Sequence, residues 1–490
     1  MAISYQLPRA QRIEMQMKRV ALKGAFGASG IISDNALISF LRSALGLHRY
    51  PEGQVFLEKG AVALKRAVAE SNAKCRNKLV DNLFLNECVT GQKVRSHISR
   101  QIGFELPVLL VISPTMRCPL RCYGCYSAQY AKDSDLDYVV FDQLITEAKS
   151  LGIYFFVISG GEPFTYPQIH ELFRKHYDAW FMVYTSGITL NQEGVRKLAA
   201  LGNVFPCISV EGFRREVDER RGKGHFERVM QAFGNLRRMK VPFGFSATVT
   251  AKNSDLVMSD EFIEYYSEQG ARVGWYFQYM PIGREPNFDL LPTPEQRIER
   301  YHRLCGLRAK HKILLSDFWN DGPIVGGCIA ARRYLHVNHA GRVEPCVFCQ
   351  FSIDSVYEKG LLEILKTSPL FAAVRKKQPY NDNYLRPCMI LDNPHVLKEV
   401  VEKTGACETC GQGAKRLVND LYSRLESYSR RYGELADCVW REKFEKEYKE
   451  TLKIEHEIRE KYDDGGIGEE TAVKDKQPKN TVISPVKAEG

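Results

Sequence analysis

The chain has 490 residues, enough for one barrel-sized domain with additions or for two to three ordinary domains. Hydrophobic residues make up 44% of it and charged residues 26%, which is the composition of a globular protein. No run of 18 apolar residues occurs, so we expect no membrane-spanning helix. The first 19 residues carry charges throughout and lack the apolar segment of a signal peptide. We therefore expect a cytoplasmic protein, with contact to a membrane surface left open.

The net charge of +10 is concentrated near the amino end. Residues 1–104 hold 16 Lys and Arg against 7 Asp and Glu. Such a basic region suits an anionic lipid surface or an acidic peptide, and nothing in the sequence favours nucleic acid. The alternative is an ordinary solvated helix face. Fourteen cysteines without an export signal indicate metal or redox chemistry in a reducing compartment rather than disulfides.

Residues 1–105 are predicted to form a basic helical extension, because helical patterns with Gly breaks dominate and no strand-rich unit occurs. Within it, residues 35–47 place five apolar side chains on one helical stripe: Leu37, Phe40, Leu41, Ala44 and Leu45. This stripe could rest on a membrane surface. The other interpretation is that it docks on the neighbouring domain.

Residues 106–290 alternate short apolar runs with helical patterns, which predicts βα units and a parallel sheet. The six predicted strands are residues 108–112, 154–158, 180–184, 204–210, 243–250 and 273–280. In α/β barrels the functional groups lie at the carboxyl ends of the strands. The residues that follow each run are therefore the first candidates for a site.

Three cysteines follow the first strand within eight residues: Cys118, Cys122 and Cys125. A 4Fe-4S cluster held by three thiolates leaves one iron without a protein ligand, so that a small molecule can coordinate there. A zinc knuckle is the alternative, although such knuckles usually take four ligands from two close pairs, and the next His or Cys is His170. Spacing alone leaves iron and zinc open.

The second strand runs into Ser159-Gly160-Gly161-Glu162-Pro163. This segment, one βα unit after the cysteine motif, resembles the radical S-adenosylmethionine (SAM) superfamily. The resemblance implies a partial (β/α)6 TIM-like barrel in which the three cysteines bind a 4Fe-4S cluster and Gly160 to Pro163 hold the amino group of SAM. One departure is Gly124, where relatives often have an aromatic residue. It leaves the packing around the cluster open, but not the ligands.

The same resemblance extends to the ends of later strands. It implies that Ser186, Ser209 and Glu211 contact the ribose and the carboxylate of SAM, and that residues 280–283 pass the adenine. For each of these residues the alternative is ordinary βα turn chemistry. The charged residues 214–221 are interpreted mostly as a solvated face, with some of them within reach of SAM or substrate.

A second cysteine set lies in residues 291–412. The spacing of Cys328, Gly341 and Cys346 resembles the start of the SPASM or twitch extension of radical SAM enzymes. The resemblance implies a hairpin whose cysteines bind an auxiliary 4Fe-4S cluster. The six candidate ligands are Cys328, Cys346, Cys349, Cys388, Cys407 and Cys410. We expect one auxiliary cluster, because the close cysteine run of a full SPASM domain is missing, and the first three candidates head the set. A zinc ribbon from Cys346/Cys349 and Cys407/Cys410 is the alternative.

Residues 413–462 are predicted to form charged helices, and residues 463–490 a disordered tail, because large apolar side chains become scarce there. The predicted fold class is thus α/β. It has a helical extension (1–105), a radical SAM barrel (106–290), a SPASM/twitch-like region (291–412), charged helices and a tail.

The resemblance implies an enzyme with strictly anaerobic chemistry. SAM would be cleaved reductively to methionine and a 5'-deoxyadenosyl radical, which takes hydrogen from an unactivated C–H bond. A one-electron donor such as flavodoxin or ferredoxin would be required. The substrate is open between lipid-like molecules and peptides, and a SPASM-type peptide maturase is one specific alternative. The other is a non-catalytic iron-sulfur or zinc protein that senses redox state or acts as a scaffold. No catalytic acid or base is assigned.

Overall fold

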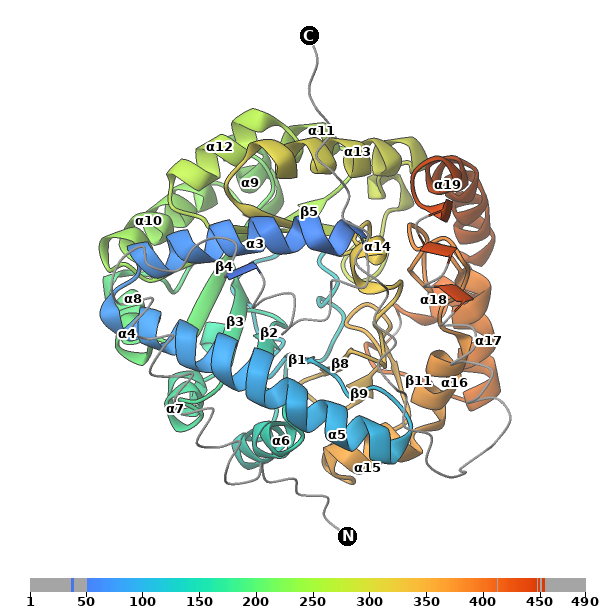
Figure 1. Ribbon diagram of the computed structural model, residues 1–490, viewed down its shortest axis with the longest axis horizontal. Coiled ribbons are helices and arrows are strands. Elements are labelled where there is room, and N and C mark those ends of the chain that lie inside the picture. Colours follow the sequence, from blue (N-terminus) through green and yellow to red (C-terminus); the bar gives the residue numbers. More distant parts are fainter. Residues whose placement is uncertain (1–36, 39–50, 412, 447, 450–451, 454–490) are drawn as a thin grey trace.

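A curved sheet surrounded by helices forms the centre of the molecule (Figure 1). The computed structural model describes residues 37–38, 51–411, 413–446, 448–449 and 452–453. In these residues the main sheet has nine strands, in the order β7-β6-β5-β4-β3-β2-β1-β8-β9. Their bounds are β1 Leu109–Ile112, β2 Phe155–Ile158, β3 Trp180–Thr185, β4 Val204–Val210, β5 Gly244–Val249, β6 Val273–Gln278, β7 Leu314–Asp317, β8 Tyr334–Val337 and β9 Val343–Glu344. All pairs from β7 to β8 are parallel, and β9 is antiparallel to β8.

Helices connect the parallel strands and cover the outside of the sheet (Figure 1). They are α6 Tyr138–Ser150, α7 Ile169–Lys175, α8 Gln192–Leu201, α9 Arg214–Arg221, α10 His225–Arg238, α11 Ser254–Val257, α12 Asp260–Glu268 and α13 Pro294–Lys310, with a short 3-10 helix η3 at Pro163–Thr165. The six predicted strands and the predicted partial barrel are confirmed, with strand ends differing by no more than two residues. Buried apolar runs were sufficient to find them, because a parallel sheet is covered on both faces.

The sheet has an outer face under the helices and an inner face toward the barrel. On the outer face, Phe181 of β3 packs against Phe173 of α7 with ring centroids 4.6 Å apart. In β6, Tyr276 donates a hydrogen bond to the Val257 carbonyl of α11. Side chains alternate between the two faces along a strand, so the neighbours of Phe181 in β3 and of Tyr276 in β6 point to the inner face.

Four amino-terminal helices close the end of the barrel where the strands begin. They are α3 Pro51–Glu70, α4 Ala73–Lys78, the π-helical η2 Leu79–Gly91 and α5 Gln92–Ile102. Asn72 donates to the Met239 carbonyl ahead of β5, and Asn82 donates to the Ala179 carbonyl ahead of β3. The backbone N–H of Tyr154, ahead of β2, donates to the Glu87 carboxylate at 2.7 Å. The described helices of the amino-terminal extension are therefore docked on the barrel. Of the predicted stripe at 35–47, only Leu37 and Ile38 lie within the described residues.

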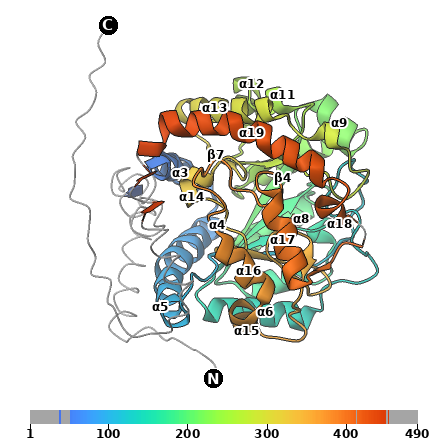
Figure 2. The ribbon, with the colours of Figure 1, turned by 90° about the vertical axis from the view of Figure 1, so that its right-hand side faces the viewer.

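The remaining elements pack beside the barrel. They are η4 Phe288–Leu290, α14 Gly322–Val325, β10 Phe351–Ser352, α15 Leu361–Thr367, α16 Pro369–Lys377, α17 Pro394–Thr404, β11 Cys407–Glu408, α18 Lys415–Val418 and α19 Tyr422–Lys443. The long helix α19 runs across α13 and α17 on the outside of the molecule (Figure 2). Strands β7 and β8 extend the barrel sheet past the predicted boundary at residue 290, and the domain division stays a prediction. The predicted tail, residues 463–490, lies outside the described residues.

No helix in the described ranges is long and apolar enough to cross a membrane.

Candidate functional site

The cysteine loop leaves the carboxyl end of β1 and rests on the chain that follows β6. The Gly124 N–H donates to the Arg284 carbonyl, and the Arg284 N–H donates to the Cys125 carbonyl at 3.0 Å. Gly124 has a φ of +61°, and a Cβ there would lie 2.5 Å from the ring of Tyr279. Tyr279 thus fills the space beside Gly124, so an aromatic ring is supplied from a distant strand end. Sequence reasoning placed Tyr279 within the sixth predicted strand, residues 273–280, but did not find this contact.

The three thiols of this loop, Cys118, Cys122 and Cys125, are all partly exposed. Burial, with the nearby charges of Glu162 and the other two thiols, raises the pKa of Cys118 to about 11. Among the described residues, the sulfur atoms of these three cysteines do not all lie within 4.8 Å of one another. Thiolates on a single zinc ion would be about 3.8 Å apart, given Zn–S bonds of about 2.3 Å. The wider arrangement fits a cluster, in which each thiolate binds a different iron.

Gly160 and Gly161 lie directly against the chain that enters the cysteine loop. A Cβ on Gly161 would be 2.2 Å from the Arg117 carbonyl oxygen, and one on Gly160 would be 2.4 Å from the Thr115 carbonyl oxygen. The Glu162 N–H donates to the Arg117 carbonyl at 2.8 Å. Glycine is required because only the absence of a Cβ permits this approach. The two motifs of the sequence therefore form one surface.

The Glu162 carboxylate is fully buried and points toward the turn after β3. It accepts hydrogen bonds from the Thr185 hydroxyl at 2.7 Å, the Ser186 N–H at 2.8 Å and the Ser186 hydroxyl at 2.6 Å. These contacts fix Ser186 next to the glycine motif. In this geometry the side chain of Glu162 organises the site, while its backbone and the two glycines face the cysteine loop.

Glu211, predicted to contact SAM, is paired with two arginines of α9. Arg220 approaches its carboxylate at 2.7 Å and Arg221 at 2.6 Å. Burial alone would raise the pKa of Glu211, but the two guanidinium groups hold it below its ordinary value. Burial alone would lower the pKa of Arg221, but the Glu211 carboxylate holds it above its ordinary value. The neighbouring Arg220 donates to the Tyr123 carbonyl of the cysteine loop at 3.4 Å, so this charged group lies beside the loop.

Arg220 and Arg221 are thus buried, although the sequence placed them in a mostly solvated stretch. Their side chains are only 7% and 10% exposed. The sequence of residues 214–221 did indicate one buried helix face, because Val217 is apolar and lies on the same face of the helix as Arg220. Ser209, the remaining predicted contact, is half-buried on the inner face and shares a hydrogen bond with Ser246 of β5.

Aromatic side chains line the inner face of the barrel. Tyr184 of β3 meets Phe277 of β6 edge to face at 5.2 Å, and Phe277 continues to Trp275 and Phe318. Tyr184, Trp275, Phe277 and Phe318 are all partly exposed, although they lie inside a sheet whose outer face is covered. Solvent therefore reaches the inside of the barrel. The remaining inner positions of β4 and β5 near these rings carry hydroxyls (Ser209, Ser246 and Thr248), and the inner face of β1 to β7 has no charged side chain.

Four of the six auxiliary candidates come together behind this aromatic wall. Burial raises the pKa of Cys346 to about 12, with a contribution from the neighbouring Cys328. The pKa of Cys349 is raised by burial and by Cys346. The pKa of Cys388 is raised by burial, by Asp392 and by Cys328. Thiols that raise one another's pKa, with Cys346 and Cys349 buried, suit a positively charged iron-sulfur core, because the deprotonated buried cysteines would otherwise be unpaired charges.

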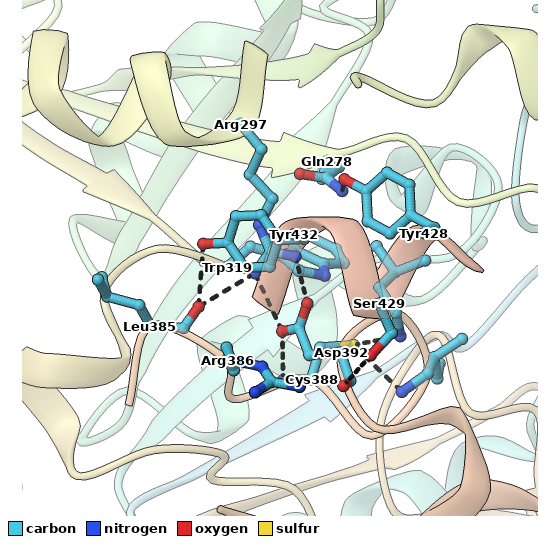
Figure 3. Close-up of polar contacts among 12 residues, drawn as sticks. Gln278, Arg297, Trp319, Leu385, Arg386, Cys388, Asp392, Tyr428, Ser429 and Tyr432 are labelled. Carbon is cyan, nitrogen blue, oxygen red and sulfur yellow. Dashed lines mark hydrogen bonds and ion pairs between the residues drawn. The ribbon is translucent and has the colours of Figure 1, made fainter. Parts of the chain in front are cut away.

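The loop that carries Cys388 is held by a buried polar network, drawn in Figure 3. The Ile390 and Leu391 N–H groups each donate to the Cys388 sulfur at 3.4 Å. The Asp392 carboxylate accepts from the Cys388 N–H at 2.9 Å and forms an ion pair with Arg297 of α13. Helix α19 contributes further contacts from its inner side.

Cys407 and Cys410, the other two candidates, lie on and next to β11. Cys407 is exposed. The Cys410 thiol is buried and donates to the Glu408 carboxylate at 3.4 Å. Within the described residues, the two pairs of the predicted zinc ribbon do not converge within the reach of one ion.

A buried chain of polar contacts from Glu344 through His336 to Ser113 connects the strands beside the two cysteine sites. His336 of β8 lies 2.8 Å from the Ser113 hydroxyl at the end of β1 and 2.6 Å from the Glu344 carboxylate of β9. Tyr130, which follows the cysteine loop, also donates to Glu344 at 2.9 Å. Tyr126 and Phe348, whose ring centroids are 5.4 Å apart, make a second contact between the two loops.

Comparison with known proteins adds two family matches. Residues 112–255 match the model of the radical SAM superfamily, and residues 328–389 match that of SPASM, an iron-sulfur cluster-binding domain. The second range begins at Cys328 and includes Cys346, Cys349 and Cys388, but ends before Cys407.

Similar sequences include PqqA peptide cyclase of Ruegeria pomeroyi, 31% identical over 55% of this chain and 76% of the relative. AdoMet-dependent heme synthase of Methanosarcina barkeri is 27% identical over 55% and 85%, and mycofactocin maturase MftC of Mycobacterium tuberculosis is 27% identical over 56% and 74%. The structure of Streptococcus suis SuiB bound to precursor peptide SuiA has the same fold, with a TM-score of 0.52 at 17% identity over 62% of this chain and 75% of SuiB. The motifs, the barrel and these matches together show that this chain is an enzyme of the radical SAM superfamily, with a SPASM domain and iron-sulfur clusters.

Proposed function

We propose that this enzyme modifies a peptide, by hydrogen abstraction from an uncharged residue held inside the barrel. The observation that carries the proposal is the inner wall formed by Tyr184, Trp275, Phe277 and Phe318, which solvent reaches and which has no charged neighbour on the strands. An apolar side chain gains free energy on entering such a wall. The hydroxyls of Ser209, Ser246 and Thr248 add hydrogen-bonding groups for a peptide backbone. PqqA peptide cyclase and the maturase MftC, among the relatives, support the same class of substrate.

A heme precursor, the substrate class suggested by another relative, is less compatible with this wall. A tetrapyrrole carries several carboxylates, and burying these without cations costs free energy. Arg220 and Arg221 share the single carboxylate of Glu211, which leaves about one net positive charge, enough for the one carboxylate of SAM but not for the several carboxylates of a tetrapyrrole.

For the metal sites we propose two clusters with seven ligands. Cys118, Cys122 and Cys125 would hold the cluster that binds SAM, beside the segment Gly160 to Pro163 that lies against the cysteine loop. The ligands of a single auxiliary cluster are Cys328, Cys346, Cys349 and Cys388. The support is the electrostatic influence of these thiols on one another, the burial of Cys346 and Cys349, and the exposure of Cys407.

When bound, the cluster and SAM supply a 5'-deoxyadenosyl radical. The residues of this chain do the positioning. Gly160 and Gly161 allow the SAM segment to lie against the cysteine loop, and Ser186, fixed by Glu162, offers a hydroxyl near it. Arg221 supplies a cation beside the loop for the carboxylate of SAM. A substrate side chain packed against the aromatic wall would displace water from the reacting carbon, which would prevent loss of the radical to side reactions.

A flavodoxin or ferredoxin is proposed as the electron donor, and the partly exposed cysteine loop supports direct access for such a protein. Contact of the basic amino-terminal region with a membrane stays a prediction.

The experiment is transfer of deuterium into 5'-deoxyadenosine, with anaerobically reconstituted full-length enzyme, SAM, a reductant and fractions of cells grown on deuterated medium. Label should come from a peptide fraction and disappear when that fraction is treated with protease beforehand. Label from the organic-soluble fraction would instead identify a lipid-like substrate, and label that resists protease in the aqueous fraction would identify a small molecule such as a tetrapyrrole. The Cys118→Ala variant is the control for label that arises without the radical.

A second arm tests the aromatic wall. Phe277→Ala should lower label transfer from the peptide fraction, while 5'-deoxyadenosine formation without substrate continues. Loss of both would show that the change damaged the SAM site rather than the substrate wall.

A further inference from the structure

The loop of the fourth auxiliary cysteine is closed by its own backbone. The Ile390 and Leu391 N–H groups point at the Cys388 sulfur at 3.4 Å, and the Asp392 carboxylate accepts from the Cys388 N–H. The Asp392 N–H returns to the Cys388 carbonyl at 3.0 Å. Asp392 is therefore the residue that keeps two N–H donors directed at the sulfur.

Asp392 is itself held by an ion pair with zero exposure on either side. Both oxygens of its carboxylate face the guanidinium of Arg297, at 3.0 Å for the Nη2–Oδ2 contact. Arg297 stacks on the ring of Tyr432, with the guanidinium carbon 3.8 Å from the ring centroid. A buried pair of this kind is retained at a large desolvation cost, and removing one partner is strongly destabilising.

Helix α19 completes the network from outside the SPASM match, which ends at residue 389. The Ser429 hydroxyl donates to the Asp392 carbonyl, and the Tyr432 hydroxyl donates to the Leu385 carbonyl at 3.0 Å. Figure 3 shows these side chains converging on the Cys388 loop from two helices, α13 and α19. The segment around Cys388 is thus held at Leu385 by Tyr432 and at Asp392 by Ser429 and Arg297.

We propose that Arg297 is a positioning residue for the auxiliary cluster. Acting through Asp392, and with Ser429 and Tyr432 of α19, it holds the Cys388 thiolate with two N–H groups on its sulfur and thereby raises the reduction potential of the cluster. Hydrogen bonds to a ligating sulfur stabilise the more negative, reduced state of an iron-sulfur cluster. The inference rests on the proposed auxiliary cluster, and it adds helix α19 to the parts of the chain that control electron flow.

A second ion pair supplies a matched control. Arg300, one turn further along α13, pairs with Asp317 at 2.7 Å, and both side chains again have zero exposure. Arg300 donates to Gln278 of β6 and not to the Cys388 loop. The two pairs therefore have similar burial and charge, but only one of them supports a cysteine ligand.

The test uses full-length protein in which Cys118, Cys122 and Cys125 are all replaced by Ala, so that only the auxiliary cluster remains. Iron content and an anaerobic redox titration followed by electron paramagnetic resonance are measured for this background and for the added Arg297→Lys and Arg300→Lys changes. Lys keeps the charge but loses the two-pronged contact. Arg297→Lys should make reduction about tenfold less favourable, which is a shift of about 59 mV to lower potential for one electron. Arg300→Lys should leave the potential in place.

Ser429→Ala is the milder variant and guards against a folding failure of Arg297→Lys. It removes one hydrogen bond to Asp392 and should shift the potential in the same direction by a smaller amount. Equal shifts for Arg297→Lys and Arg300→Lys, or no shift for Arg297→Lys and Ser429→Ala, would overturn the inference while leaving the cluster intact. A background protein that binds no iron would instead remove the auxiliary cluster itself, and with it the premise.

Discussion

The two cysteine sites of this enzyme are built in opposite ways. Cys118, Cys122 and Cys125 lie close together in the sequence on a partly exposed loop, held mainly by backbone contacts. The proposed auxiliary cysteines are as far apart in the sequence as Cys328 and Cys388. Cys346 and Cys349 are buried, Cys328 and Cys388 are partly exposed, and the buried Arg297–Asp392 ion pair lies beside Cys388. An open iron must be reached by SAM and by an electron donor, whereas a cluster with four protein ligands needs only to stay in place. The partly exposed thiols of the first site, and the buried thiols of Cys346 and Cys349 at the second, agree with this difference.

The strongest way to separate the two sites is to remove a ligand from the first. Cys118→Ala should abolish 5'-deoxyadenosine formation and lower the bound iron by about four atoms per chain, the content of one cluster. Activity is measured by chromatography and iron by a colorimetric assay. Cys438→Ser, at an exposed cysteine of α19, is the matched control and should behave as the parent protein. Normal activity in the Cys118 variant would contradict the assignment.

The next test divides the auxiliary candidates. Cys349→Ala should lose about four irons per chain, because a buried site cannot replace a missing thiolate with water at low cost. SAM cleavage without substrate should persist at a reduced rate. Cys407→Ser should retain all iron, since Cys407 is exposed and its thiol donates to the nearby Gly405 carbonyl. Iron analysis and Mössbauer spectra decide, and equal iron loss in the two variants would return Cys407 to the ligand set.

Resistance to chelators should differ between the clusters. A chelator with dithionite should remove iron from the exposed loop in a fast phase and from the buried site in a slow phase, at least about tenfold slower, because an opening cost of about 1.4 kcal/mol is enough for that ratio. The loss of iron absorption with time gives both rates. A single phase in the parent protein, with equal rates in Cys118→Ala and Cys349→Ala, would mean that burial does not protect the auxiliary cluster.

The smallest expected effect concerns the glycine contact at the open site. Gly161→Ala places a Cβ 2.2 Å from the Arg117 carbonyl oxygen, so one of two backbone segments must move. We expect an overpacking cost of about 1–3 kcal/mol and SAM binding weaker by about tenfold. Gly234→Ala in α10, where a Cβ meets nothing within 4 Å, is the control and should stabilise the protein by about 0.5–1 kcal/mol. Calorimetric titration with SAM and thermal unfolding measure the two quantities, and unchanged SAM affinity in Gly161→Ala would rule out the close approach.

The sequence by itself determined the barrel and the first site. Each of its strands is a short buried run, and the proposed ligands of the SAM cluster lie within eight residues, so local pattern carries the information. Gly160 and Gly161 were found in the same way, because glycine is the residue type that lacks a Cβ and so permits a close backbone approach.

Only the tertiary structure decided which groups come together across long stretches of chain. It separated Cys388 from Cys407, brought Tyr279 beside Gly124, buried Glu211 between two arginines, and joined Arg297 with Asp392 across 95 positions. These contacts depend on how helices and strand ends pack, and no periodicity in one segment encodes its partner in another. Local chemistry thus fixed what the cofactor is, while packing fixed which residues surround and control it.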